Sequence, residues 1–134
     1  MSAHRFPVRI YYEDTDFSGN VYHAAYLKFF ERGRTEFLRE AGIRHSELMA
    51  EGIAFAVRSM DIAFDGAAHI DDALTVVTEI AEVSGARLTL RQTILRDETV
   101  LTRARVVVVA IKTGGGPARM PAQVRALAER KGAS

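Results

Sequence analysis

The sequence predicts an α+β domain in which one antiparallel sheet packs over one long central helix. Two observations lead to this fold class. A stretch from Tyr22 to Gly42 repeats its apolar residues with the period of an amphipathic helix. From about Ala54 to Lys112, apolar and polar residues alternate as they do in strands. Because one strand-like segment precedes the helix and four follow it, the strands and the helix are segregated along the chain, as in α+β folds.

The first expected element is a strand, since Val8, Ile10 and Tyr12 alternate with polar residues in "HRFPVRIYYE". The helix follows, and Gly42 is suited to its C-terminus. At 100° per residue its apolar face comprises Tyr26, Phe30, Gly33, Phe37 and Ala41. His23 falls near the centre of that face, so we expect its ring to point inward.

Between strand and helix lies an acidic loop, "EDTDFSGN". Its spacing matches the start of an EF-hand calcium loop, beginning at Asp14. However, the twelfth position is Ala25, where an EF-hand has a bidentate glutamate, and a strand precedes the loop where an EF-hand has a helix. A calcium loop is therefore disfavoured, and we expect no metal site.

The four later strands are separated by turn-forming stretches, "DGAAHIDD", "EVSGAR" and "RDE". Four strands in succession predict an antiparallel meander. A short second helix is expected in "RHSELMAEG", and a short C-terminal helix or tail over residues 122–134, after Pro121. With 134 residues in all, the chain is expected to form a single domain over 1–134.

Composition limits the function classes. The chain has 18 basic and 17 acidic residues scattered along it, which gives no basic stripe for nucleic acid. It has no cysteine, which excludes disulfides and thiolate chemistry. The longest apolar run, Val106 to Ile111, is too short to span a membrane, and the N-terminus has no apolar signal core. We therefore expect a cytoplasmic protein without a membrane span.

The acidic loop is also the best candidate for chemistry. The first four amides of a helix lack intrahelical partners, so a helix beginning near Tyr22 and His23 can hold a carbonyl oxygen that gains negative charge. Asp14 and Asp16 precede it as candidate bases or nucleophiles for acyl transfer. The alternative is that both aspartates only stabilise the loop and the helix start.

Two further charged residues, Glu31 and Arg34, lie toward the apolar side of the helix, three positions apart, where they can pair. A structural ion pair is one interpretation, and a role in an acyl pocket is the other.

The run "YYEDTDFSGNVYHAAYLKFFERGRTEFLR" closely resembles the signature of hotdog-fold acyl-CoA thioesterases of the 4-hydroxybenzoyl-CoA thioesterase type, in particular the YbgC branch associated with the Tol–Pal system. The resemblance extends more weakly through "AAHIDDALTVVTEI" to the "RMPAQVRAL" tail. It implies the hotdog fold, an antiparallel sheet wrapped around a long central helix. It also implies a homodimer with its sheets joined edge to edge and its active sites at the interface, and a dimer of dimers (homotetramer) in many relatives.

The resemblance also implies which residues form the site. Asp16 corresponds to the family's catalytic aspartate, and the backbone N–H of His23 to the group that polarises the carbonyl. The His23 side chain and Tyr12 are further catalytic candidates, while Asp14 is expected to be structural. The expected substrate-binding residues are Val21, Tyr22, Phe30, Glu31 and Met60. The sequence departs from the family in "FDGAAHIDD", with Phe64 and Gly66 at a turn near the pocket.

The function implied is hydrolysis of an acyl thioester, carried on coenzyme A or on acyl carrier protein, to a free acid. Coenzyme A is then part of the substrate, and no separate cofactor is expected. Its phosphates are expected to meet arginines of the strands, and the candidates are Arg87, Arg91, Arg96 and Arg103. Two alternatives stay open: an enoyl-thioester hydratase or dehydratase on the same fold, and a non-catalytic module that binds acyl carrier protein or an envelope partner.

Overall fold

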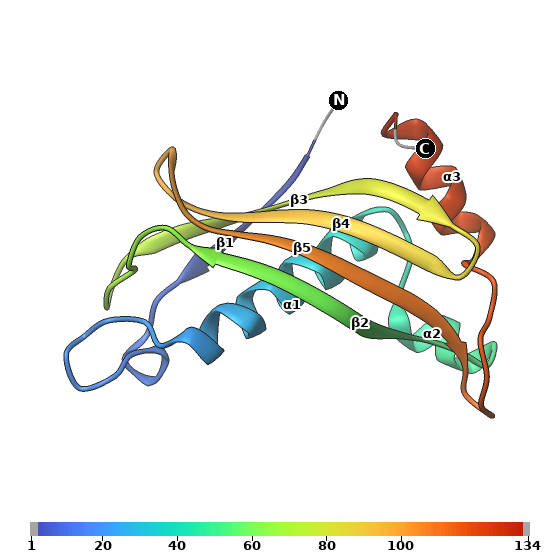
Figure 1. Ribbon diagram of the computed structural model, residues 1–134, viewed down its shortest axis with the longest axis horizontal. Helices are drawn as coiled ribbons and strands as arrows, with labels where there is room; N and C mark the ends of the chain where they lie inside the picture. Colours follow the sequence, from blue (N-terminus) through green and yellow to red (C-terminus); the bar gives the residue numbers. More distant parts are fainter. Residues whose placement is uncertain (1–2, 133–134) are drawn as a thin grey trace.

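The computed structural model describes residues 3–132 and shows a curved sheet arching over one long helix (Figure 1). In chain order the elements are β1 (His4–Arg9), the 3₁₀ turn η1 (Tyr12–Asp14), α1 (His23–Glu40), α2 (His45–Ala50), β2 (Ile53–Phe64), β3 (Ala73–Ser84), β4 (Arg87–Arg96), β5 (Thr99–Lys112) and α3 (Ala122–Arg130). The predicted α+β class and its central helix are confirmed. No helix within residues 3–132 combines the length and the apolar content that crossing a membrane requires.

The five strands form one antiparallel sheet in the order β1-β3-β4-β5-β2. Strands β3, β4 and β5 are consecutive neighbours, as predicted. The prediction of a four-strand meander is wrong, because β2 pairs with β5, from Ile53 opposite Lys112 to Phe64 opposite Thr102. The stretch read as a turn between β2 and β3, residues 65–72, is instead a crossover from one side of the sheet to the other.

The sheet is bent by irregularities in three of its ladders. One extra residue lies between Val57 and Ser59 on β2, one between Ile80 and Glu82 on β3, and one between Val100 and Thr102 on β5. An extra residue in one strand bends it and increases the local twist. These shifts let the sheet curve around α1.

Helix α1 turns an apolar face to the sheet, as its periodicity predicts. Its buried residues are Ala25, Tyr26, Phe29, Phe30, Gly33, Phe37 and Leu38. The helix ends before Gly42, which has φ of +84° and donates its N–H to Arg39 O, while Ile43 N donates to Leu38 O at 2.9 Å. A left-handed glycine of this kind satisfies carbonyls at the helix end.

The C-terminal helix α3 buries Val124, Leu127 and Ala128. Pro121 is its N-cap rather than its first helical residue. The last two residues of the expected tail, 133–134, lie outside the described part of the chain.

Helix α1 approaches the sheet closely at Gly33. A Cβ atom placed on Gly33 would lie 2.6 Å from Cγ1 of Val76 on β3. Beside it, the buried amide of Gln92 on β4 donates to Phe30 O at 3.0 Å and to the hydroxyl of Thr78 at 2.9 Å. The absence of a side chain on Gly33 allows the short distance between helix and sheet, and the hydrogen bond from Gln92 to Phe30 O fixes the helix against sliding over the sheet.

We expect Gly33→Ala to destabilise the fold by about 1–3 kcal/mol, because the added methyl group forces apart a packed helix and strand. Urea denaturation monitored by circular dichroism measures the free energy of unfolding. Gly114→Ala is the matched control, since Gly114 has no atom within 4 Å of an added Cβ and its φ is not positive. Equal stabilities of the two variants would contradict the close approach.

Candidate active site

The acidic loop begins with a turn that Asp14 holds together. Its carboxylate oxygen Oδ2 accepts the backbone N–H of Tyr11 at 2.9 Å, and its carbonyl oxygen accepts the N–H of Tyr22 at 3.3 Å. Both interactions are internal to the loop. They support the expected structural role of Asp14.

Asp16 sits in a second, tight turn. Thr15 and Val21 form an isolated antiparallel bridge, and inside it the N–H of Asp16 donates to Asn20 O at 2.9 Å. Gly19, with φ of +84°, donates back to Asp16 O at 3.1 Å. The backbone on both sides of Asp16 is therefore fixed before the helix begins.

The Asp16 carboxylate is exposed, and one of its oxygens is already bonded. Oδ1 accepts the N–H of Ser18 at 2.8 Å and also its hydroxyl. These hydrogen bonds, the hydroxyl first, lower the pKa of Asp16 below its ordinary value. The carboxylate is thus ionised at neutral pH, and both of its bonds to Ser18 are made by Oδ1.

Helix α1 begins at His23, with Tyr22 as N-cap, as the sequence predicted. Ala25 N donates to Tyr22 O at 3.0 Å, whereas the N–H groups of His23 and Ala24 have no protein acceptor in the described residues. The structure therefore has two unpaired amides at the positive end of the helix dipole, a few residues after an ionised carboxylate.

The expectation of an inward His23 ring is wrong, because the side chain is exposed. The ring stacks on Phe64 at the end of β2, with centroids 4.5 Å apart and planes at 27°. As the first residue of the helix, His23 lies beyond the core that the later turns bury. Phe64, one of the two departures from the family pattern, is thus part of the wall of the site. The other, Gly66, packs against Leu101 of β5 so closely that an added Cβ would lie 2.9 Å from Leu101 Cδ2.

The crossover of residues 65–72 fastens the loop to the core. Ala68 is fully buried; its carbonyl accepts the N–H of Val21 at 2.9 Å, and its own N–H donates to the Tyr26 hydroxyl oxygen at 3.1 Å. Ile70 N donates to Gly19 O at 2.9 Å. These bonds tie the acidic loop, the crossover and α1 into one unit.

Arg96, at the end of β4, holds the same crossover from the other side. One of its guanidinium nitrogens donates to Asp72 Oδ2 at 2.9 Å and to Ala67 O at 3.0 Å. Asp72 Oδ2 also accepts the N–H of His69 at 2.9 Å. Arg96 is one of the candidate arginines for phosphate binding, and in the structure its guanidinium instead binds the crossover.

Sequence reasoning missed Ser18 and the pair of Ala68 and Tyr26. Ser18 had a signal, since a hydroxyl residue two positions after an aspartate is the pattern of a turn that hydrogen-bonds the carboxylate. The Ala68–Tyr26 bond had none, because it joins residues 42 positions apart.

The other expected site residues have different surroundings. Tyr12 is 76% exposed in η1, and within residues 3–132 its side chain makes no hydrogen bond to Asp16 and no ring contact with His23. Val21 and Phe30 are buried in the hydrophobic core. Tyr22 is partly exposed beside the helix start, and Met60 is half-buried on β2.

Glu31 and Arg34 line a pocket of about 80 Å³ between α1, α2 and the sheet. The expected ion pair between them is absent in residues 3–132, since Arg34 Nη1 donates to Gln92 Oε1 at 3.1 Å instead. Burial lowers the pKa of Arg34, and the charge of nearby Glu31 acts in the opposite direction. Apart from these two residues, Thr35 and His45, the walls of the pocket are apolar.

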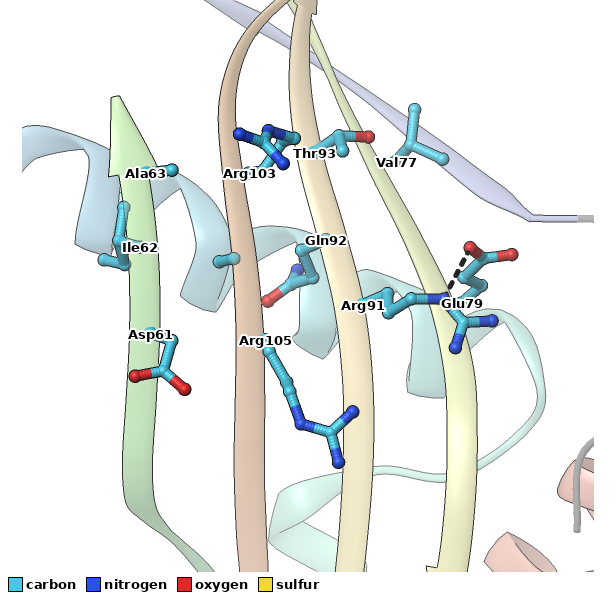
Figure 2. A pocket seen from close by; sticks show the side chains of 11 residues that line it. Asp61, Ile62, Ala63, Val77, Glu79, Arg91, Gln92, Thr93, Arg103 and Arg105 are labelled. Carbon is cyan, nitrogen blue, oxygen red and sulfur yellow. Dashed lines mark hydrogen bonds and ion pairs between the residues drawn. The ribbon is translucent and has the colours of Figure 1, made fainter. Parts of the chain in front are cut away.

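A larger and more open hollow of about 460 Å³ lies on the outer face of the sheet, with α1 behind it (Figure 2). Arg91 of β4 and Arg105 of β5 lie opposite each other across the ladder. Each has an acidic neighbour, Glu79 at 3.1 Å from Arg91 and Glu82 at 3.7 Å from Arg105. Arg103 likewise pairs with an acid, Asp65, at 2.7 Å. The charges of this hollow are therefore balanced within the chain.

An arching antiparallel sheet over one helix, with an acidic turn at the helix start, defines the class, and comparison with known proteins agrees. Residues 11–127 match the family model described as the thioesterase-like superfamily, and the chain belongs to this family. Its fold is the hotdog fold. Over 90% of its length it superimposes on the crystal structure of a probable thioesterase from Bartonella henselae, with a TM-score of 0.85 and 46% identity, covering 100% of that chain.

Two relatives show which branch of the thioesterase-like superfamily this chain resembles most clearly. The chain is 45% identical over 123 residues to the acyl-CoA thioesterase YbgC of Haemophilus influenzae, covering 90% of both chains. It is 47% identical over 108 residues to the acyl-CoA thioester hydrolase YbgC of Escherichia coli O6:H1, covering 80% of this chain and 81% of that one. The predicted resemblance to YbgC-type thioesterases is confirmed, and so is the class of enzyme, a thioester hydrolase.

We expect Ser18→Ala to raise the pKa of Asp16. The change removes the hydroxyl that stabilises the charged carboxylate, while the Ser18 N–H bond remains, so the rise is partial. Carboxyl-detected NMR titration measures the midpoint for Asp16 directly. Ser46→Ala, in α2, should leave that midpoint unchanged. Identical midpoints in wild type and Ser18→Ala would contradict the hydrogen-bonded turn.

Proposed function

We propose that this protein is an acyl-CoA thioesterase that hydrolyses an acyl thioester to a free acid and coenzyme A. The observation that carries the proposal is the ionised Asp16 held ahead of the unpaired amides of His23 and Ala24. The activities in the names of its YbgC relatives support the same substrate class. An acyl group carried on acyl carrier protein presents the same thioester and is an alternative source of substrate. The cytoplasmic location expected from the sequence stays a prediction.

In the proposed mechanism the thioester carbonyl oxygen accepts the His23 N–H, which stabilises the negative charge that develops on it. Asp16 then acts in one of two ways. As nucleophile, it attacks the carbonyl carbon, the C–S bond breaks, thiolate leaves, and water hydrolyses the resulting anhydride. As general base, it takes a proton from a water that attacks the same carbon, and the C–S bond then breaks with departure of the thiolate. The His23 ring and Tyr12 are proposed to contact the substrate beside this centre.

We expect Asp16→Asn to lower turnover by about 10²-fold to 10⁴-fold, because it removes the base or nucleophile and little else. Thiol release from short, long and aromatic acyl-CoA substrates measures the loss, and thermal unfolding checks the fold. Asp14→Asn is the matched control in the same loop, since an amide oxygen can still accept the Tyr11 N–H. Near-normal activity of Asp16→Asn would overturn the assignment of Asp16.

Single turnover in ¹⁸O-labelled water separates the two roles of Asp16. A nucleophilic carboxylate takes label into the protein when water attacks the Asp16 carbonyl of the anhydride, and mass spectrometry of the Asp16 peptide detects it. A general base leaves the label in the product acid alone.

We also propose a homodimer with β2 at its interface. Strand β2 is an edge strand of 12 residues, and its outer side has no partner in the described chain. The opposite edge strand, β1, carries Pro7, which discourages further pairing. Sedimentation equilibrium should give twice the chain mass of 14.8 kDa, or four times for a dimer of dimers. A stable monomer at micromolar concentration would contradict this.

A further inference from the structure

The pocket between α1, α2 and the sheet contains a cation that the fold only partly satisfies. Arg34 is half-buried, and its one protein acceptor in residues 3–132 is Gln92 Oε1, at 3.1 Å. The amide nitrogen of Gln92 donates to Phe30 O and to Thr78, which fixes the orientation of the glutamine. A guanidinium has five N–H donors, so most of those on Arg34 are left for water or a ligand.

Large apolar side chains of α1 and β2 stand at both ends of the interval between the helix start and this pocket, and an acyl path can follow them. We call it the α1–β2 seam, defined by Leu27 of α1 and by Val57, Met60 and Phe64 of β2. Three of these large apolar side chains are conspicuously exposed, at 44% for Leu27, 48% for Val57 and 43% for Phe64. At one end Phe64 stacks on His23, and at the other Val57 lines the pocket together with Arg34.

Positions 23, 27, 31 and 34 follow one another along one side of α1. A helix rises about 1.5 Å per residue, which puts Arg34 about 16 Å beyond His23. Its guanidinium reaches back toward the turn of Phe30, where Gln92 also binds. The seam is therefore roughly 10–16 Å long, which an extended chain of about 8–13 bonds spans.

We propose, on the basis of the thioesterase activity proposed above, that Arg34 binds a carboxylate at the distal end of the acyl chain. The thioester lies at Asp16 and the His23 N–H, the methylene chain lies in the seam, and the terminal carboxylate enters the pocket. The preferred substrate is thus a coenzyme A thioester of a dicarboxylic acid of about ten carbons.

A carboxylate fits the donors that are left. Its two oxygens match two parallel N–H groups of a guanidinium, and such pairs are stronger when their surroundings exclude water. The apolar walls of the pocket, Leu38, Phe55, Leu88, Leu90 and Val108 among them, provide those surroundings. A methyl-terminated chain of the same length would leave the Arg34 donors without this partner. Glu31 also lines the pocket and opposes the incoming group, but its side chain is exposed, so this repulsion is weaker than the attraction of the half-buried Arg34.

The test compares two coenzyme A thioesters of equal chain length, one ending in a carboxylate and one in a methyl group. In the wild type we expect kcat/KM for the carboxylate-ended substrate to be higher by roughly tenfold to hundredfold, the range of a charge-assisted hydrogen bond. Arg34→Met should abolish or invert this preference, measured as the ratio of kcat/KM for the two substrates. A wild type that prefers the methyl-ended substrate overturns the proposal without any variant.

Two further variants test whether the effect of Arg34→Met comes from lost carboxylate binding or from a change in the fold. Arg39→Met removes another arginine of α1, one paired with Glu36 at 3.2 Å, and should keep the wild-type preference. Arg34→Lys keeps a cation beside Gln92 and should restore part of the preference. If Arg34→Met lowers the unfolding temperature but the ratio of the two substrates stays at the wild-type value, Arg34 only supports the fold and the proposal fails.

A binding measurement separates this proposal from the proposed function. Isothermal titration with free decanedioic acid should show binding to wild type and a loss of roughly tenfold or more in affinity for Arg34→Met, with no turnover required. If no acyl-CoA releases thiol but this difference holds, the thioesterase proposal fails and the carboxylate site stands. If both substrates are hydrolysed equally and the acid binds both proteins equally, only the carboxylate site fails.

Discussion

The structure depends on how closely α1 approaches the sheet. At Gly33 nothing larger than hydrogen fits against Val76, and Gln92 crosses the remaining gap to bond a carbonyl of the helix itself. A buried amide with all of its groups satisfied holds one geometry, because any shift leaves a polar group unpaired. The position of the helix above the sheet is therefore fixed at the turn from Phe30 to Gly33. Because the helix is rigid, holding this turn also places the helix start and sets the direction of its unpaired amides.

The chemistry of the loop follows from this rigid support. The acidic turn has few side chains of its own in the core, so it relies on bonds to neighbours that the core already holds in place. Ala68 provides two such bonds, one to the loop and one to the hydroxyl of Tyr26 on α1. The carboxylate of Asp16 remains exposed to solvent while the backbone around it is held on both sides. A charged group can thus be placed with accuracy without the energetic cost of burying it.

Periodicity was enough to predict the elements and the class of fold, because the helix and the strands each bury one face. The acidic turn and the helix start at His23 were also predictable, since capping and turn patterns are local. Strand order was not: the pairing of β2 with β5 depends on where the crossover packs, and that packing is decided by contacts between residues distant in sequence. The orientation of His23 failed for a related reason, because a helical wheel places a residue by angle alone and ignores where along the axis the core ends. The pairing of Arg34 with Gln92 rather than Glu31 likewise required the position of β4.

The crossover between β2 and β3 places part of the wall of the site outside the sheet, which a tight turn in a four-strand meander would not do. Residues 65–72 belong to no strand, yet they adjoin Phe64 and fasten the loop that carries Asp16. Apart from Ala68, which is buried, their side chains are mostly exposed. Substitutions at its exposed positions whose side chains make no hydrogen bond, such as Ala67 and Ile70, can reshape this region while the ladder registers and the helix contact stay as they are. Selection can therefore adjust specificity and stability in this chain as nearly independent traits.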